Sequence, residues 1–219
     1  NFSLLDALPI SRIANEWHSN NLAVSWIKDA KSSFDPQTFH PELVPAGFQW
    51  DLAKVIAKPH RVATTLPTWI ATMPLEELWE SLWKSIVYVF LATRDSKTGH
   101  SNFIVLHLLS SLWGIEKILE VVADEAVTRH AIGHYFAKVV VLLSTPSSGF
   151  PTKQSLMDIR TEFPDETIDS PDLDWKEMVT AGSAEEEEHN IKLVYVCQRL
   201  WYRYGYWKGF SEAAQSFTL

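Results

Sequence analysis

The sequence has little cysteine and little glycine, and each shortage excludes a class of protein. Cys197 is the single cysteine among 219 residues, which excludes a disulfide framework and a cysteine-rich zinc site. The 8 glycines are scattered singly, so neither a phosphate-binding P-loop nor a dinucleotide-binding fingerprint is present. No Gly-x-Ser-x-Gly nucleophile elbow occurs either. We interpret Cys197 as a small buried hydrophobic residue rather than a nucleophile.

Positive charge and long apolar runs are also scarce. The 19 Lys and Arg residues are outnumbered by 27 Asp and Glu residues, and this net charge of -8 disfavours general binding of nucleic acid. The longest apolar stretches, residues 86–92 and 139–143, are far shorter than a membrane span. No signal peptide opens the chain, although Asn1 in place of Met indicates a trimmed start or a part of a longer chain. We expect a cytoplasmic protein that binds neither nucleic acid nor a membrane.

Large hydrophobic side chains are abundant. Hydrophobic residues make up 46% of the sequence, with 10 tryptophans and 11 phenylalanines, which argues against disorder. So many aromatic side chains suit a bulky core or a pocket for a flat apolar ligand. The length suits one domain, or at most two small ones.

The spacing of apolar residues predicts an all-α protein. Residues 1–73 are rich in proline and poorly periodic, so we expect an irregular N-terminal segment with short helices at 11–30 and 49–57. From residue 74 to 219, apolar residues recur every three or four positions and no strand pairing is evident, which indicates a helical bundle of about five principal helices. The longer helices are predicted over residues 74–93, 100–122, 124–143 and 183–204, and shorter ones over 153–160, 174–181 and 210–217.

The most distinctive segment contains four consecutive acids followed by a histidine. Ser183 and Glu186 fit a capping box, and acids suit the positive end of a helix dipole. Glu188 and Lys192 have the spacing of an ion pair along a helix. Helix capping explains these charges, but it does not explain His189, which shares a helix face with Lys192.

His107 lies within the apolar helix predicted over residues 100–122. A neutral imidazole in such a place needs a hydrogen-bond partner or a metal ion. One interpretation is a core histidine bonded to a neighbouring carbonyl, or to Ser110 or Ser111; the other is a ligand-binding histidine. Gly114, on the same face, either leaves room for a ligand or allows a neighbouring helix to approach closely.

A second pair of histidines, His130 and His134, is spaced one helical turn apart. Two imidazoles at this spacing can chelate a metal ion, but the sequence supplies no third ligand at a fixed offset. Polar positions on an amphipathic helix are therefore the favoured interpretation for this pair.

Three segments resemble questin oxidase-like proteins. In the first, residues 98–111, a polar residue and Phe103 precede an apolar run that leads to His107 and two serines. The second reads Glu188-His189-Asn-Ile-Lys192-Leu-Val, an acid-His-x-x-Lys pattern. The third joins residues 202–205 to residues 210–214. Together the segments extend the resemblance over residues 70–219.

The resemblance implies an oxidoreductase of aromatic polyketides such as anthraquinones. Members are Baeyer–Villiger-type oxidases or non-haem iron oxygenases that act with O2, so the implied metal is Fe(II), with NADPH a candidate reductant. Matched onto this sequence, His107 and His189 would be metal-binding imidazoles, and Lys192 would be an anionic ligand. A lysine ammonium has no lone pair, so Lys192 could serve only if neutral or carboxylated. We expect the tips of these three side chains to converge.

The resemblance also implies what binds near these residues. A small aromatic polyketide is the expected substrate, and Phe103 and Trp113 are candidates to line its pocket. Family members are longer, and His18, His40 and His60 lie in segments that match none of theirs. The alternative is therefore a non-catalytic helical subunit, or half of a heterodimer, whose site is completed by a second chain or a missing N-terminal half. A carrier of an apolar ligand is a third interpretation.

Overall fold

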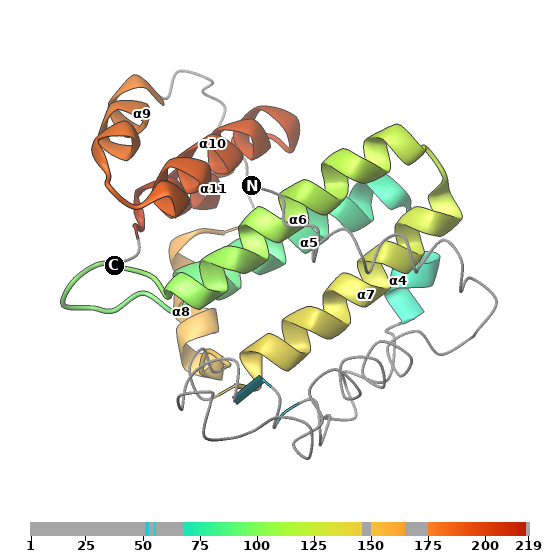
Figure 1. Ribbon diagram of the computed structural model, residues 1–219. Helices are drawn as coiled ribbons and strands as arrows, with labels where there is room; N and C mark the ends of the chain where they lie inside the picture. Colours follow the sequence, from blue (N-terminus) through green and yellow to red (C-terminus); the bar gives the residue numbers. More distant parts are fainter. Residues whose placement is uncertain (1–50, 53–54, 56–67, 146–149, 165–174, 218–219) are drawn as a thin grey trace, which may run out of the picture. The chain divides into compact units, whose positions relative to one another are not determined.

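The computed structural model describes residues 51–52, 55, 68–145, 150–164 and 175–217 (Figure 1). These residues are largely helical and contain no β-strand, which confirms the all-α prediction. The helix predicted at 11–30 and most of the one at 49–57 lie outside the described residues. The described helices are α4 (Thr68–Thr72), α5 (Leu75–Leu91), α6 (Phe103–Val122), α7 (Glu125–Leu143), α8 (Lys153–Glu162), α9 (Trp175–Ala184), α10 (Glu188–Arg203) and α11 (Lys208–Gln215).

The chain divides into two compact units. One unit comprises Asn1–Leu75 and Gly114–Phe150, and the other comprises Glu76–Trp113 and Pro151–Leu219, so the division falls within α6. Every residue that the sequence predicted for the metal site or the substrate pocket belongs to the second unit: Phe103, His107, Trp113, His189 and Lys192.

In the second unit, α5 buries a wide apolar stripe. Leu78, Val87 and Phe90 have no exposed surface. Glu76 and Glu77 lie in the first turn, where the helix dipole stabilises negative charge. Removing each large apolar side chain from water contributes about 1.5–3 kcal/mol. The sequence predicted this helix within two residues at each end because its apolar spacing is regular.

The start of α6 is fixed by a side-chain cap. The Asn102 side chain accepts hydrogen bonds from the backbone N–H groups of Ile104 (2.9 Å) and Val105 (3.2 Å). Leu106 and Leu109 are buried in the core, whereas His107 lies half-buried on the opposite side of the helix. The buried leucines therefore hold α6 in a rotation that turns His107 away from the apolar core.

The helix α10 carries the second half of the predicted site. It packs against both α9 and α11 (Figure 1). Cys197, Leu200 and Trp201 are fully buried on its inner face, which confirms Cys197 as a hydrophobic core residue. Burial also raises the pKa of the Cys197 thiol far above its ordinary value, so the thiol stays protonated. Gly205, with φ of 82°, follows the end of α10 in the left-handed conformation that glycine adopts readily.

The predicted capping box at the start of this helix is wrong. Ser183 lies inside α9, which continues to Ala184, and α10 begins only at Glu188. The N-cap is Glu187, whose carboxylate accepts from the backbone N–H of His189 at 3.2 Å. The run of acids thus spans the turn between two helices rather than the first turn of one.

Three contacts join the remaining parts of the second unit. The Tyr88 hydroxyl donates to the carbonyl of Phe163 at 2.7 Å, and the Trp207 indole donates to the carbonyl of Pro164 at 2.9 Å. Arg94 and Glu212 form an ion pair at 2.9 Å. These bonds tie the end of α8 and the region of α11 to α5.

In the first unit, α7 packs against α4 (Figure 1). The Arg129 guanidinium donates to the carbonyls of Ile70 (2.9 Å) and Met73 (2.8 Å), which satisfies carbonyl groups at the end of α4. The Asp124 side chain caps α7 by accepting from the N–H of Val127 at 3.0 Å. Among the described helices, none is both long and apolar enough to cross a membrane.

Candidate functional site

Two histidines from helices far apart in the sequence meet in the second unit. The ring of His107, on α6, and the ring of His189, on α10, have centroids 4.8 Å apart and planes inclined at 45°. The phenyl ring of Phe103 packs edge-on against both imidazoles, with centroids 4.8 Å from His107 and 5.0 Å from His189. The three rings form one cluster. We call His107 and His189 the histidine pair.

The hydrogen bond of His107 fixes which ring nitrogen carries the proton. Its Nδ1 lies 2.9 Å from the carbonyl oxygen of Phe103, one turn earlier on α6. A carbonyl can only accept, so Nδ1 must donate, and Nε2 of the neutral ring keeps its lone pair. The predicted alternatives, the hydroxyls of Ser110 and Ser111, donate instead to the backbone carbonyls of His107 and Leu108.

His189 is held in the same way by a carboxylate. Its Nδ1 forms a hydrogen bond with Oε1 of Glu187, the residue that caps α10. The hydrogen bonds from the ring and the backbone N–H of His189 lower the pKa of Glu187 below its ordinary value, so this carboxylate is ionised at neutral pH. An ionised carboxylate only accepts, which makes Nδ1 the donor, and in the neutral ring this leaves the lone pair on Nε2.

Lys192 lies one turn after His189 but is turned toward an acid. Its Nζ forms an ion pair with Oε1 of Glu188 at 3.0 Å, and the side chains of Lys192 and Glu188 are 38% and 69% exposed. The hydrogen bond from Lys192 also lowers the pKa of Glu188. In this state Lys192 is an ammonium without a lone pair, as its spacing from Glu188 predicted.

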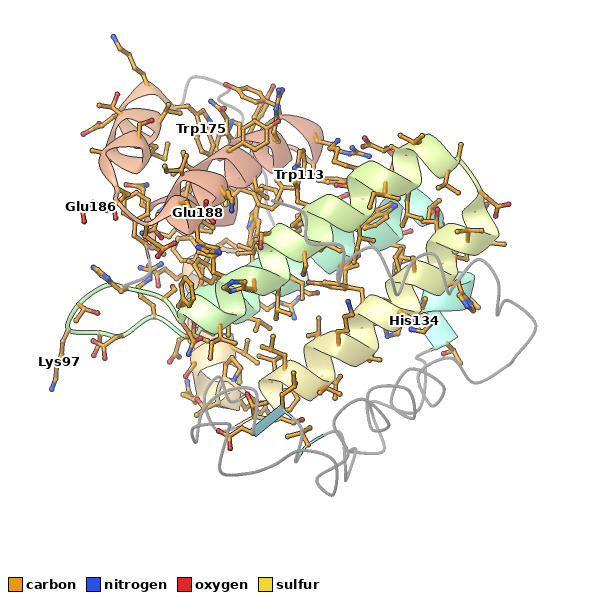
Figure 2. The ribbon with its side chains drawn as sticks, viewed as in Figure 1. Lys97, Trp113, His134, Trp175, Glu186 and Glu188 are labelled. Atoms are coloured by element: carbon orange, nitrogen blue, oxygen red, sulfur yellow. The ribbon has the colours of Figure 1, made fainter. Side chains whose placement is uncertain are left out.

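The two candidate pocket residues occupy different places. Phe103 lies against the histidine pair, whereas the ring of Trp113, further along α6, packs edge-on against Tyr195 of α10 with centroids 5.8 Å apart. Figure 2 labels Trp113 on α6, and it labels Glu186 and Glu188 near the start of α10. Phe103 is therefore the pocket candidate in direct contact with the predicted ligands.

The hydrogen bonds of the histidine pair resemble those of metal-binding histidines. Metal-binding histidines almost always donate their second ring nitrogen to a carbonyl or carboxylate, as Nδ1 of His107 and of His189 both do here. Among the residues that the structure describes, no group of three His, Cys, Asp or Glu side chains is placed to hold a metal. The described residues therefore supply two imidazole donors, and Lys192 would add a third only after losing its positive charge.

The other predicted pair, His130 and His134, is also in contact. The two rings lie on α7 of the first unit with centroids 5.5 Å apart, and Figure 2 labels His134 on this helix. His134 is only 7% exposed, and its pKa is lowered to about 4 by burial and by the nearby charges of His130 and Lys138. Burial lowers the pKa of His130 as well. His134 is thus a neutral buried residue, separate from the histidine pair.

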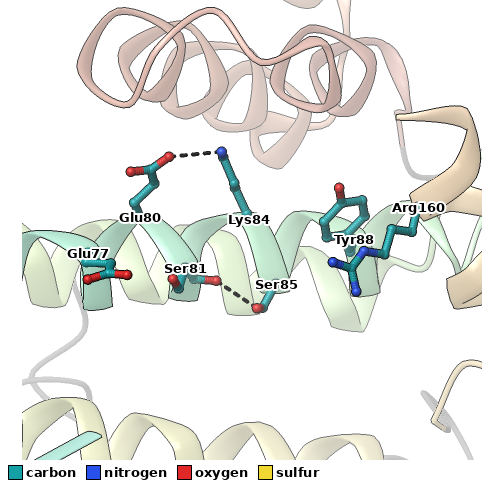
Figure 3. A pocket seen from close by; sticks show the side chains of 7 residues that line it. All are labelled: Glu77, Glu80, Ser81, Lys84, Ser85, Tyr88 and Arg160. Carbon is teal, nitrogen blue, oxygen red and sulfur yellow. Dashed lines mark hydrogen bonds and ion pairs between the residues drawn. The ribbon is translucent and has the colours of Figure 1, made fainter. Parts of the chain in front are cut away.

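A polar pocket of about 440 Å³ lies along α5 and does not include the histidine pair (Figure 3). Its lining residues are Glu77, Glu80, Ser81, Lys84, Ser85, Tyr88 and Arg160. Lys84 pairs with Glu80 at 2.9 Å, and the Ser85 hydroxyl donates to the carbonyl of Ser81 at 2.7 Å. The Tyr88 hydroxyl is bonded to the carbonyl of Phe163, so several polar groups of the pocket already have partners within the chain.

The sequence did not predict the contact of Glu187 with the site. The acids before His189 were expected to cap the helix, and Glu187 does so, but its bond to the imidazole was not expected. A carboxylate two positions before a histidine carries no signal within a helix, because residues at that spacing do not face each other. The contact forms because Glu187 has an extended backbone, with φ of -82° and ψ of 110°.

Comparison with known proteins identifies one family. Residues 16–197 match the family model described as questin oxidase-like. The match begins well before residue 70, in a segment where the residue patterns showed no resemblance, and it ends before residues 202–205 and 210–214, which it does not support. A search of the curated proteins found no match, and a search of the solved structures found none either.

Proposed function

This chain belongs to the questin oxidase-like family, and we propose that it is an oxidoreductase that uses O2 to oxidise an aromatic polyketide of the anthraquinone type. The family supports the reaction class and the substrate class. The observation that carries the proposal is the histidine pair. Two imidazoles from separate helices have ring centroids 4.8 Å apart, and the Nδ1 atom of each already has a hydrogen-bond partner.

The reaction we propose is the opening of a ring beside a ketone. In a Baeyer–Villiger-type step, one oxygen atom of O2 enters the bond between the ketone carbon and its neighbour, giving a lactone. The other oxygen atom leaves as water, with two electrons from NADPH and two protons, one of them from the solvent. Hydrolysis of the lactone then opens the ring.

The side chains of the histidine pair are suited to hold a metal ion and a flat substrate. Nε2 of His107 and Nε2 of His189 would bind the metal, which is Fe(II) in our proposal and would supply the activation of O2. The bonds to Phe103 and Glu187 keep both rings in the tautomer that this binding needs. The phenyl ring of Phe103 would exclude water on one side and offer an apolar surface to an aromatic ring.

Lys192 would join this site as a carbamate. Carboxylation replaces the ammonium with an anionic group that has oxygen donors, and it removes the attraction to Glu188 that now holds Nζ at 3.0 Å. The side chain is partly exposed at the start of α10, so CO2 can reach it. Lys192 and His189 share a helix face, which allows both to bind the same ion.

A turnover assay with matched variants tests the proposal. The chain is loaded with Fe(II) and mixed with a hydroxyanthraquinone, NADPH and ¹⁸O₂, and the product is analysed by mass spectrometry. We expect labelled, ring-opened product from the wild type and at least a roughly 100-fold loss in His107→Ala and His189→Ala, since losing only the outer partner of a ligand costs about 10–100-fold. His100→Gln is the control, because the hydrogen bonds of His100 in its turn run through its backbone N–H and carbonyl.

Iron content separates the enzyme from the non-catalytic subunit. The subunit remains a second candidate because the described residues provide only two imidazoles and no third His, Cys, Asp or Glu ligand. Iron bound in proportion to protein and lost in both alanine variants would support the oxidase. Absence of iron, together with an unchanged anthraquinone, would contradict it and favour a chain whose site is completed by a second chain.

A further inference from the structure

Four acids, Glu185 to Glu188, run from the turn after α9 to the first residue of α10, and each has different partners. Glu185 accepts a hydrogen bond from the side-chain amide of Asn190 at 3.1 Å, and Glu188 pairs with Lys192. Glu186 is exposed to solvent. Glu187 alone among the four forms a hydrogen bond with an imidazole, that of His189.

Glu187 contacts His189 twice through the same oxygen atom. Oε1 accepts from the backbone N–H of His189 at 3.2 Å and from Nδ1 of its ring. The first bond caps α10 and fixes the position of the His189 backbone in its first turn. The second fixes the rotation of the ring and places the proton on Nδ1. Two bonds from one carboxylate therefore set both the position and the tautomer of one side chain.

The second bond works against the intrinsic preference of the side chain. A neutral histidine in water favours the tautomer with the proton on Nε2, in which Nε2 cannot bind a metal. His107 overcomes this preference through the carbonyl of Phe103, a backbone acceptor that no substitution removes. His189 depends instead on a side chain 39% exposed, so its tautomer can be changed by mutation.

We propose that Glu187 is a positioning residue of the site, which holds the neutral ring of His189 with its proton on Nδ1, so that Nε2 keeps a free lone pair beside the ring of His107. The consequence for metal binding rests on the proposed function, whereas the control of the tautomer does not. Glu187 touches neither substrate nor metal in this proposal and acts only through His189.

The test uses variants that separate capping from ring positioning. Glu187→Ser keeps a favoured N-cap residue but has a side chain too short to reach the ring. Glu187→Gln keeps an oxygen acceptor at the same distance along the side chain and is the conservative rescue. Glu186→Ala is the control, since it removes a neighbouring acid that is exposed. Circular dichroism of each variant verifies that the helices are retained.

The first readout is the tautomer in the metal-free full chain, measured by long-range ¹H–¹⁵N NMR with ¹⁵N-labelled histidine at pH 8. His189→Gln assigns the His189 signals, and His107 is an internal reference. We expect a protonated Nδ1 and an unprotonated Nε2 in the wild type, Glu187→Gln and Glu186→Ala. We expect the proton of His189 to move to Nε2 in Glu187→Ser, with His107 unchanged.

The second readout is the affinity for Co(II), measured by titration as a stable substitute for Fe(II). Glu187→Ser should bind Co(II) about 10–100-fold more weakly than the wild type, whereas Glu187→Gln should regain most of this loss. An unchanged tautomer in Glu187→Ser would overturn the inference even if the wild type binds iron and is active. A tautomer that follows Glu187 in a chain that binds no metal would sustain the inference and contradict the proposed function instead.

Discussion

Among the described histidines, His107 and His189 have an environment that contrasts with that of His134. His107 and His189 each have one ring nitrogen bonded and lie half-buried. His134 is 7% exposed, and neither of its ring nitrogens has a hydrogen-bond partner among the described residues. A buried imidazole of this kind is costly to protonate, because its positive charge would lose the solvation by water.

His134 should make the protein sensitive to acid. Its pKa is 6.5 in the unfolded chain and about 4 in the folded protein, so the unfolded state binds more protons between these two values. The free energy of unfolding should therefore fall as the pH drops from 6.5 to 4, by at most about 3 kcal/mol from this residue. Urea unfolding of the wild type at pH 7 and pH 5 measures the loss.

The matched variant for this prediction is His134→Leu, which removes the titrating group but keeps an apolar side chain. The fall in unfolding free energy between pH 7 and pH 5 should be smaller in this variant, whatever its stability at pH 7. Equal falls in the two proteins would show that His134 is protonated equally easily in the folded and unfolded states.

At this same scale, the sequence indicated the histidine pair but not its geometry. His107 and His189 became ligand candidates through the family resemblance, since spacing alone allowed a core histidine at position 107. The bond to Phe103 is the type of contact expected for a core histidine, and it is also the one that frees Nε2. Glu187 could not be singled out among four acids, because its reach depends on a backbone conformation at the cap.

Among the elements, helix interiors were predictable and helix junctions were not. The buried stripe of α5 and the long apolar pattern of α6 placed both helices within three residues of their observed ends. Between α9 and α10, each of four consecutive acids is an acceptable residue for a helix start. Apolar periodicity does not decide among them, so the predicted start at Ser183 was wrong and the observed start is Glu188.

The close approach of α9 to α10 depends on one glycine. A Cβ added at Gly182 would lie 2.7 Å from Cγ2 of Val194, a buried residue of α10. Gly182→Ala should therefore lower the free energy of unfolding by about 1–3 kcal/mol, as overpacking does in other cores. The same substitution should loosen the turn that presents Glu187, because α9 and α10 flank it.

A double-mutant cycle in urea unfolding measures this contact. Val194→Ala removes the clashing methyl group, so Gly182→Ala should cost less in the Val194→Ala background than in the wild type. The two substitutions should thus couple by at least about 0.5 kcal/mol, as expected for residues in contact. Strict additivity would mean that the helices separate freely and that Gly182 does not set their distance.

At the scale of the whole molecule, composition excluded classes of protein, and the family match shows the family and supports the proposed function. The chain's acidity disfavoured nucleic-acid binding, and its single cysteine excluded a disulfide framework. The helical pattern predicted the all-α fold class, which the structure confirms. The family match covers residues 16–197, whereas the short motifs placed the resemblance over residues 70–219. The division into two units within α6 had no signal in the sequence, since the apolar pattern of that helix is continuous.

The location of bound iron tests the central claim most directly. Crystals of the full chain grown with Fe(II) and bicarbonate would give an anomalous difference map at the iron absorption edge. The account predicts a peak at about 2.0–2.2 Å from Nε2 of His107 and from Nε2 of His189, with a carboxylated Lys192 as a further ligand. A peak elsewhere, for instance between His130 and His134, or no peak beside the histidine pair would contradict it.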